Sequence, residues 1–270
     1  MALLTITYVK GHGGATTTAL AAALAAPAQA RPVLVECDPS GGDLMHRHRL
    51  TARPSVVDLA AAARGPKAGT SEVFTAGAQQ LHVRDQAVEV VVAPAGGAQT
   101  RAALPELTRP GQAALNPPDR LVVADCGRLD AGSPARPLLA ASDVVMVLAR
   151  PRADELAHLR EQLADLVDLT VGRLVVALTP GGAYSANEVA DWLTRYVADE
   201  LARDPELLMV TGPLPHDRRA AGVLDGDLAP GRRWRRLPLL VAVDRLLGDL
   251  APLLRTAARQ DPRSRTEARR

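Results

Sequence analysis

Residues 9–18 read Val9-Lys10-Gly11-His12-Gly13-Gly14-Ala15-Thr16-Thr17-Thr18. An apolar run, Leu3 to Val9, leads into this stretch, and an alanine- and leucine-rich run, Ala19 to Ala26, follows it. The pattern predicts a strand, a glycine-rich turn and a helix, which is the arrangement of a phosphate-binding loop. Small residues let backbone N–H groups surround an anion, and the N-terminus of the helix adds positive potential.

Apolar runs recur along the chain with helical patterns between them. Most are uninterrupted, which is typical of strands buried on both faces of a largely parallel sheet. We expect strands at residues 3–9, 33–36, 88–93, 121–124, 144–148, 174–178 and 207–210. We expect helices at residues 16–26, 56–64, 100–107, 135–141, 154–167, 186–202, 218–224 and 237–258. This alternation predicts a doubly wound α/β fold, with a mostly parallel sheet and helices on both faces.

Residues 1–258 show no internal boundary, so we expect them to form a single domain. Residues 259–270 are polar and basic, and we predict a disordered tail there. Residues 65–85 combine Gly65, Pro66, Gly69 and Gly77 with little periodicity. We interpret this segment as a loop with an irregular helix.

Composition narrows the class of protein. The chain is 47% hydrophobic but only 2% aromatic, so the core must consist of alanine, valine and leucine. Two distant cysteines, Cys37 and Cys126, indicate buried reduced thiols rather than a disulfide framework or a zinc site. There is no leader pattern and no apolar run near the roughly 20 residues of a membrane span. We expect a cytoplasmic protein without an integral membrane segment.

Three oxygen-bearing side chains lie at the ends of predicted elements. Thr16 opens the first helix, Asp38 follows the second strand, and Asp125 ends a central strand. Because the carboxyl ends of parallel strands share one edge of the sheet, we expect these side chains to converge on the loop. A hydroxyl and two carboxylates there would suit Mg²⁺. The same residues are also common helix caps and turn formers, which leaves a purely structural role open for each.

The order of these motifs resembles the ParA/MinD group of deviant-Walker P-loop ATPases, which are relatives of the nitrogenase iron protein. That family's loop reads K-G-G-x-G-K-[ST]-[ST], and the matching residues here are Lys10, Gly11, Gly14, Thr16 and Thr17. Its D-x-D-P motif is similar to residues 36–39, and its Walker B strand ends at a position like Asp125. Residues 142–148 and 214–218 also resemble family segments, the latter a proline-containing stretch that contacts adenine.

The resemblance implies ATP or ADP and Mg²⁺ as cofactors. Metal ligation would fall to Thr16, Asp38 and Asp125, and Asp38 would also position an attacking water. Lys10 would be the signature lysine, which reaches the partner's phosphates across a homodimer. Nucleotide contacts would come from Gly11, His12, Gly13, Gly14, Ala15, Thr16, Thr17, Pro215 and Asp217.

Ala15 departs from the family pattern, because it replaces the lysine of the phosphate-binding loop. Each lost charge-assisted bond to the phosphates would cost roughly 1.5–3 kcal/mol, and hydrolysis would fall about 10²–10³-fold. His12, when protonated, could supply a donor, although a histidine facing solvent in a turn is the plainer interpretation. Glu36 replaces the family's first aspartate and could disturb the site. Asp43 is a candidate residue for sensing the γ-phosphate.

The C-terminal region contains four arginines around Trp234: Arg232, Arg233, Arg235 and Arg236. They could bind DNA phosphates or form a solvated basic turn. Leucine and valine then repeat at helical spacing over residues 239–250, which predicts packing on the sheet; a membrane-surface helix is the alternative.

Three functions follow. The first is a ParA/MinD-like nucleotide-binding protein that positions cargo, such as DNA in chromosome partitioning, a pilus or a secretion complex, through ATP-linked dimerisation. The second is a pseudo-ATPase scaffold for a partner machine. The third is a DNA-binding module that uses residues 232–236 independently of nucleotide.

Overall fold

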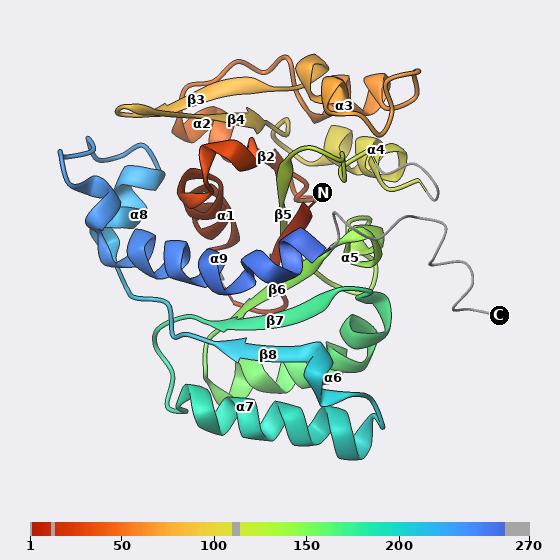
Figure 1. The fold of residues 1–270 in the computed structure, drawn as a ribbon, viewed down its shortest axis with the longest axis vertical. Coiled ribbons are helices and arrows are strands. Elements are labelled where there is room, and N and C mark those ends of the chain that lie inside the picture. Colours follow the sequence, from red (N-terminus) through yellow and green to blue (C-terminus); the bar gives the residue numbers. More distant parts are fainter. Residues whose placement is uncertain (1, 12–13, 110–113, 257–270) are drawn as a thin grey trace.

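An eight-stranded sheet runs between two layers of helices in the computed structural model, which describes residues 2–11, 14–109 and 114–256 (Figure 1). The strands are β1 (Ala2–Tyr8), β2 (Val33–Glu36), β3 (Gln79–Val83), β4 (Gln86–Val91), β5 (Leu121–Arg128), β6 (Val144–Ala149), β7 (Arg173–Leu178) and β8 (Leu208–Thr211). Their order is β3-β4-β2-β5-β1-β6-β7-β8. Only the pair formed by β3 and β4 is antiparallel among these described strands. The prediction of a mostly parallel, doubly wound sheet is therefore confirmed.

Helices cover both faces of the sheet. They must do so because successive side chains of a strand point to opposite faces and nearly all of them are apolar here. The α-helices are α1 (Ala15–Ala25), α2 (Leu44–Arg47), α3 (Val56–Ala62), α4 (Ala98–Leu107), α5 (Arg136–Ala141), α6 (Ala153–Leu169), α7 (Ala186–Arg195), α8 (Arg218–Leu224) and α9 (Pro238–Thr256). In β6, Val144 and Met146 belong to the core beneath α1, α8 and α9, whereas Val145 and Val147 belong to the core beneath α6 and α7. Both faces are apolar because both are buried.

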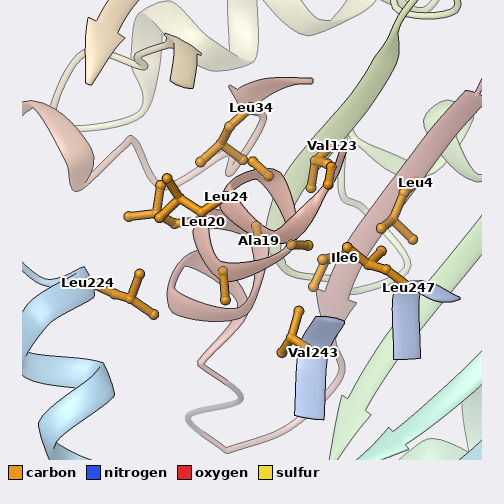
Figure 2. Packing of buried hydrophobic residues seen from close by; sticks show 14 of the residues in the cluster. Leu4, Ile6, Ala19, Leu20, Leu24, Leu34, Val123, Leu224, Val243 and Leu247 are labelled. Atoms are coloured by element: carbon orange, nitrogen blue, oxygen red, sulfur yellow. The ribbon is translucent and has the colours of Figure 1, made fainter. Parts of the chain in front are cut away.

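The alanine-rich α1 lies at the centre of one layer, between the sheet and α9 (Figures 1 and 2). Its small side chains let the helix approach both neighbours closely. Leu20 and Leu24 fill the remaining space beside β2 residue Leu34 and α8 residue Leu224 (Figure 2). This packing explains how a chain with few aromatic residues builds a core.

The predicted stripe on the C-terminal helix packs against this layer. Its buried residues are Leu239, Leu240, Val243, Leu246, Leu247 and Leu250. The prediction that this face packs on the body of the protein is confirmed. None of the helices in the described part of the chain has the length and apolar character needed to cross a membrane.

The interpretation of residues 65–85 as loop and irregular helix is wrong in its second half. A 3₁₀ helix, Ser71–Ala76, is followed by β3, which pairs with β4 across a tight turn. Arg84 in that turn has φ +57°. Leu81 and Val83 are buried while the residues between and before them are exposed, and this short period-2 pattern was the missed signal.

Several boundaries also differ from expectation. β4 begins at Gln86, two residues early, and α7 ends at Arg195, where a π-helical turn, Tyr196–Glu200, replaces the expected continuous helix. The predicted tail at residues 259–270 lies outside the described residues, as do residues 257–258. A single domain spanning residues 1–258 therefore stays a prediction.

Candidate functional site

The loop between β1 and α1 has the backbone of a tight glycine turn. β1 ends at Tyr8 and α1 begins at Ala15, which is buried. Gly11 has φ +79° and Gly14 has φ +68°, a left-handed conformation that glycine adopts without steric cost. Gly14 caps α1 through its backbone, so the helix N-terminus is not blocked by a side chain. Its N–H groups are placed to meet an anion.

Other residues of the predicted loop have different environments. Lys10 is exposed, and its contact with a partner's phosphates stays a prediction. Thr17 donates its hydroxyl to Oδ1 of Asp225 at 3.3 Å, so its side chain links α1 to the end of α8. His12 and Gly13 lie outside the described residues.

Thr16 and Asp125 lie close to each other. The Thr16 side chain favours the charged form of the Asp125 carboxylate and so acts to lower its pKa. β1 and β5 are neighbours with Ile6 opposite Asp125, so the end of β5 lies beneath the loop that leaves β1. The Gly127 N–H also donates to Oδ1 of Asp125, at 3.1 Å. The Asp125 carboxylate therefore both accepts a hydrogen bond in the turn at Gly127 and lies beside Thr16 at the start of α1.

Asp38 joins them from the neighbouring strand. The Cys37 N–H donates to the Asp125 carbonyl at 2.7 Å, which continues the β2–β5 ladder to the residue before Asp38. One Asp38 oxygen accepts the Ser40 N–H at 2.7 Å. The other lies over Gly127, only 1.8 Å from where a Cβ on that residue would stand. Gly127 has φ +56°, so both its conformation and its missing side chain admit the Asp38 carboxylate.

Burial makes these carboxylates costly to ionise. It raises the pKa of Asp125 to about 6, against the Thr16 side chain and the hydrogen bond from Gly127, which favour the charged form. Burial also raises the pKa of Asp38, against its bond from Ser40. The pKa of Tyr8 is raised by burial and then by the charges of Asp38 and Asp125. The two acids therefore lie together where water solvates them poorly and the potential is negative. A bound cation would lower the free-energy cost of ionising them.

This donor set fits Mg²⁺ when phosphate or water completes it. Thr16, Asp38 and Asp125 supply hydroxyl and carboxylate oxygens, the ligands that Mg²⁺ prefers. Within the described residues there is no cluster of three or more histidine, cysteine, aspartate or glutamate side chains arranged to hold a metal ion.

Glu36 has a role that the sequence did not reveal. Its Oε1 accepts the N–H groups of Asp43 and Leu44 at 2.7 and 2.9 Å, and its Oε2 accepts the Ala93 N–H at 2.9 Å. Burial raises the pKa of Glu36 to about 7, against these three donors. The side chain fastens residues 43–44 to the end of β4. Finding it from the sequence would require knowing that these segments return to β2.

Asp43, the candidate γ-phosphate sensor, is exposed and paired with Arg47, with 2.7 Å between Oδ2 and Nη2. Arg47 also pairs with Asp225, with 2.6 Å between Nη1 and Oδ1. These pairs connect α2 to the end of α8, which in turn contacts α1 through Thr17. A sensing role for Asp43 stays a prediction.

Asp217, a predicted nucleotide contact, holds two helices. Its Oδ1 accepts the Ala220 N–H at 2.9 Å and caps α8, and its Oδ2 accepts the Leu239 N–H at 3.2 Å in the first turn of α9. Both oxygens are therefore engaged with backbone. Pro215 is half-buried just before this cap. An adenine contact by this segment stays a prediction.

The basic segment before α9 surrounds a buried tryptophan. Trp234 is 3% exposed and its Nε1 donates to Oδ1 of Asp85 at 3.4 Å. The Arg235 guanidinium lies 5.5 Å from the Trp234 ring centroid. The exposed residues of the patch are Arg232, Arg233, Arg235 and Arg236. Trp234 thus anchors a surface on which four arginines face solvent.

Both cysteines are free and buried, as predicted. A hydrogen bond with the Cys37 thiol and burial raise the pKa of the Cys126 thiol well above its usual value. The pair fills the interior next to the site without supplying a thiolate ligand.

No family model and no curated protein matches the sequence. Solved structures do match its fold. The cell division ATPase MinD of Pyrococcus furiosus is similar with a TM-score of 0.67 and 16% identity, over 93% of this chain and 99% of that one. An ATP complex of a McdA variant from Cyanothece is similar with a TM-score of 0.63 and 16% identity, over 92% and 96%.

A third similar structure is the pNOB8 ParA bound to nonspecific DNA. It has a TM-score of 0.53 and 12% identity, over 93% of this chain and 98% of that one. At these identities the likeness concerns the fold, and it extends over nearly the full length of each protein. Together with the strand order and the glycine turn between β1 and α1, it shows that the chain has a ParA/MinD-like P-loop fold.

Proposed function

We propose that this protein binds ATP or ADP with Mg²⁺ and positions a cargo through nucleotide-linked homodimerisation, with weakened or absent hydrolysis. The observation that carries the proposal is the meeting of Thr16, Asp38 and Asp125 beside the glycine turn. Three side chains from separate segments converge there. Burial raises the pKa of both carboxyl groups, and a bound cation would stabilise their charged forms.

The chemistry assigned to each residue follows from its position. Thr16, Asp38 and Asp125 hold the metal, which when bound neutralises phosphate charge. The backbone N–H groups of the loop and of the start of α1 donate hydrogen bonds to the phosphate oxygens. Asp38 orients a water molecule, and exposed Lys10 reaches the second protomer.

Ala15 sets the expected level of activity. An alanine methyl cannot replace the ammonium that would hold the phosphates, so nucleotide binding should be weaker by one to two decades. Hydrolysis should fall by about 10²–10³, because a group that stabilises transition-state charge is missing. The protein would then act mainly through binding and dimerisation rather than turnover.

Titration calorimetry with ATP·Mg²⁺ on the wild-type protein and on Ala15→Lys tests the proposal. We expect weak binding by the wild type and binding about 10–100-fold tighter by the variant. A phosphate-release assay on both proteins then separates a slow ATPase from a pseudo-ATPase scaffold. If neither protein binds nucleotide while both remain folded by circular dichroism, the proposal is wrong.

The exposed arginines around Trp234 support a second candidate, a DNA-binding module. The similarity to a DNA-bound ParA points the same way. In that case DNA retention would fall steeply with salt, with a slope of about −0.9 per phosphate contacted, and would not depend on ATP. Retention that requires ATP would instead favour DNA as the cargo of the first function. The cargo could equally be a pilus or secretion complex.

A further inference from the structure

Arg150 lies beside the phosphate-binding loop although it is far from it in sequence. β6 is the sheet neighbour of β1, with Leu148 opposite Tyr8. Arg150 directly follows β6, as Lys10 and Gly11 follow β1, so both segments leave the same edge of the sheet side by side.

The ion pair of Arg150 and Glu155 lies next to the loop. A Cβ placed on Gly11 would stand 2.9 Å from Nη2 of Arg150 and 2.7 Å from Oε1 of Glu155, closer than real Cβ contacts allow. Gly11 therefore leaves the space that this ion pair occupies. On the other side, the Arg150 Cδ lies 3.9 Å from where a Cβ on Gly181 would stand, and Gly181 also has positive φ.

The buried carboxylate of Glu155 contacts Arg150. Glu155, in the first turn of α6, is 6% exposed. One of its oxygens lies 2.6 Å from Nε of Arg150, and the other accepts the Arg150 backbone N–H at 3.0 Å. Glu155 thus accepts a hydrogen bond from the Arg150 backbone and forms an ion pair with its guanidinium, and both Oε1 of Glu155 and Nη2 of Arg150 lie toward Gly11. About a third of the Arg150 side chain stays exposed, at 35%.

Two other arginines, Arg47 and Arg101, are engaged by neighbouring groups. Arg47 is shared by two carboxylates, Asp43 and Asp225. Arg101 donates to the Pro39 carbonyl at the far side of the site. Among the residues that the structure describes, Arg150 forms an ion pair with one carboxylate, that of Glu155, and the shortest contact of this pair is 2.6 Å between Nε and Oε1.

The charge around the loop also calls for a cation. Three buried or half-buried acids, Glu36, Asp38 and Asp125, lie at the neighbouring strand ends. A nucleoside di- or triphosphate adds further negative charge, and Ala15 brings none of the positive charge that the loop would otherwise contribute. A guanidinium suits phosphate because its planar N–H groups can donate in pairs and stay charged at all working pH values.

We propose that Arg150 binds the phosphates of the nucleotide in place of the lysine missing at position 15, and that Glu155 is its positioning residue. The inference rests on the proposed function, since it names the residue that makes nucleotide binding possible without that lysine. The ligand class is a nucleoside di- or triphosphate. Recognition is by charge-assisted hydrogen bonds from the terminal nitrogens.

Calorimetry with ATP·Mg²⁺ and with AMP tests this on full-length variants. Arg150→Ala should weaken ATP binding by roughly 10–100-fold. The ratio of ATP to AMP affinity should fall with it, whereas a merely structural role would weaken both nucleotides equally. Adding Ala15→Lys to Arg150→Ala should restore ATP binding. Arg152→Ala is the matched control, because Arg152 is exposed and paired with Asp154 nearby, and it should leave affinity within about twofold.

A second variant guards against misfolding. Arg150→Ala leaves buried Glu155 without its cation, so the double variant Arg150→Gln with Glu155→Gln removes both charges together. It should show the same loss of ATP binding as Arg150→Ala. ATP binding at the wild-type level in the double variant would overturn the inference and leave the proposed function intact. Absence of nucleotide binding by folded wild-type protein would overturn both.

Discussion

At the residue scale, Asp125 combines a structural bond with a site that opposes its ionisation. Its carboxylate accepts the Gly127 N–H and lies beside Thr16, and yet burial raises its pKa from 3.8 to about 6. A buried acid with few compensating charges costs stability when it ionises. Here that cost coincides with the position where a cation is expected.

The raised pKa of Asp125 makes the stability of the fold depend on pH. Between about pH 4 and 6 the folded state holds a proton at Asp125 that the unfolded state releases. The contribution to stability is therefore fully present below about pH 4 and is lost as pH rises through about 6, by up to about 3 kcal/mol. Glu36, with a pKa raised to about 7, extends the decline to that pH.

Asp125→Asn should flatten this profile in the metal-free protein. Asparagine keeps an acceptor for Gly127 but does not ionise, so the variant should be the more stable protein at pH 8 and show a shallower decline from pH 4.5. Urea unfolding across that range measures it. Asp249→Asn, at an exposed position on α9, is the control and should follow the wild-type curve. Parallel curves for wild type and Asp125→Asn would contradict this account of the site.

At the scale of elements, the turn at the end of β5 joins two strand ends into one site. Asp38, from the end of β2, lies over Gly127, from the end of β5, in space that a side chain would fill. The position of the Asp38 carboxylate therefore depends on a glycine in the neighbouring strand.

Gly127→Ala should break that arrangement. Alanine at φ +56° costs about 1–2 kcal/mol, and its Cβ would displace the Asp38 carboxylate. We expect lower stability by urea unfolding and loss of ATP·Mg²⁺ binding by calorimetry. Gly248→Ala is the matched control, because an added Cβ there meets nothing within 4 Å on helix α9. It should stabilise the protein by about 0.5–1 kcal/mol and leave binding unchanged. Normal ATP binding by Gly127→Ala would show that Asp38 need not lie where we place it.

The sequence predicts a residue's position best when that position follows from the pattern of the strand or helix next to it. Thr16, Asp38 and Asp125 could be predicted as a group because each follows or opens a strongly patterned strand or helix. β3 was missed because only two inward residues, Leu81 and Val83, carry its pattern. Residues whose partners are set by topology were out of reach. Glu36 depends on where residues 43, 44 and 93 return, and Arg150 depends on β6 lying next to β1.

At the scale of the whole molecule, we propose that nucleotide links two copies of the chain. The net charge of +2 gives no strong general attraction to nucleic acid, so specificity must reside in local features such as the loop and the Trp234 surface. Only two lysines occur among 32 basic residues, and one of them is exposed Lys10 at the loop. That composition makes the role of Lys10 unusually easy to isolate.

Sedimentation velocity with and without ATP·Mg²⁺ measures whether the protein dimerises when it binds nucleotide. The comparison needs wild type, Lys10→Ala and Lys67→Ala, the last being the other lysine, which is exposed and paired with Glu72. We expect wild type and Lys67→Ala to shift from monomer to dimer when ATP·Mg²⁺ is added, and Lys10→Ala to stay monomeric. A sedimentation coefficient for the wild type that is unchanged at saturating ATP·Mg²⁺, or a Lys10→Ala variant that dimerises as fully as wild type, would contradict the account.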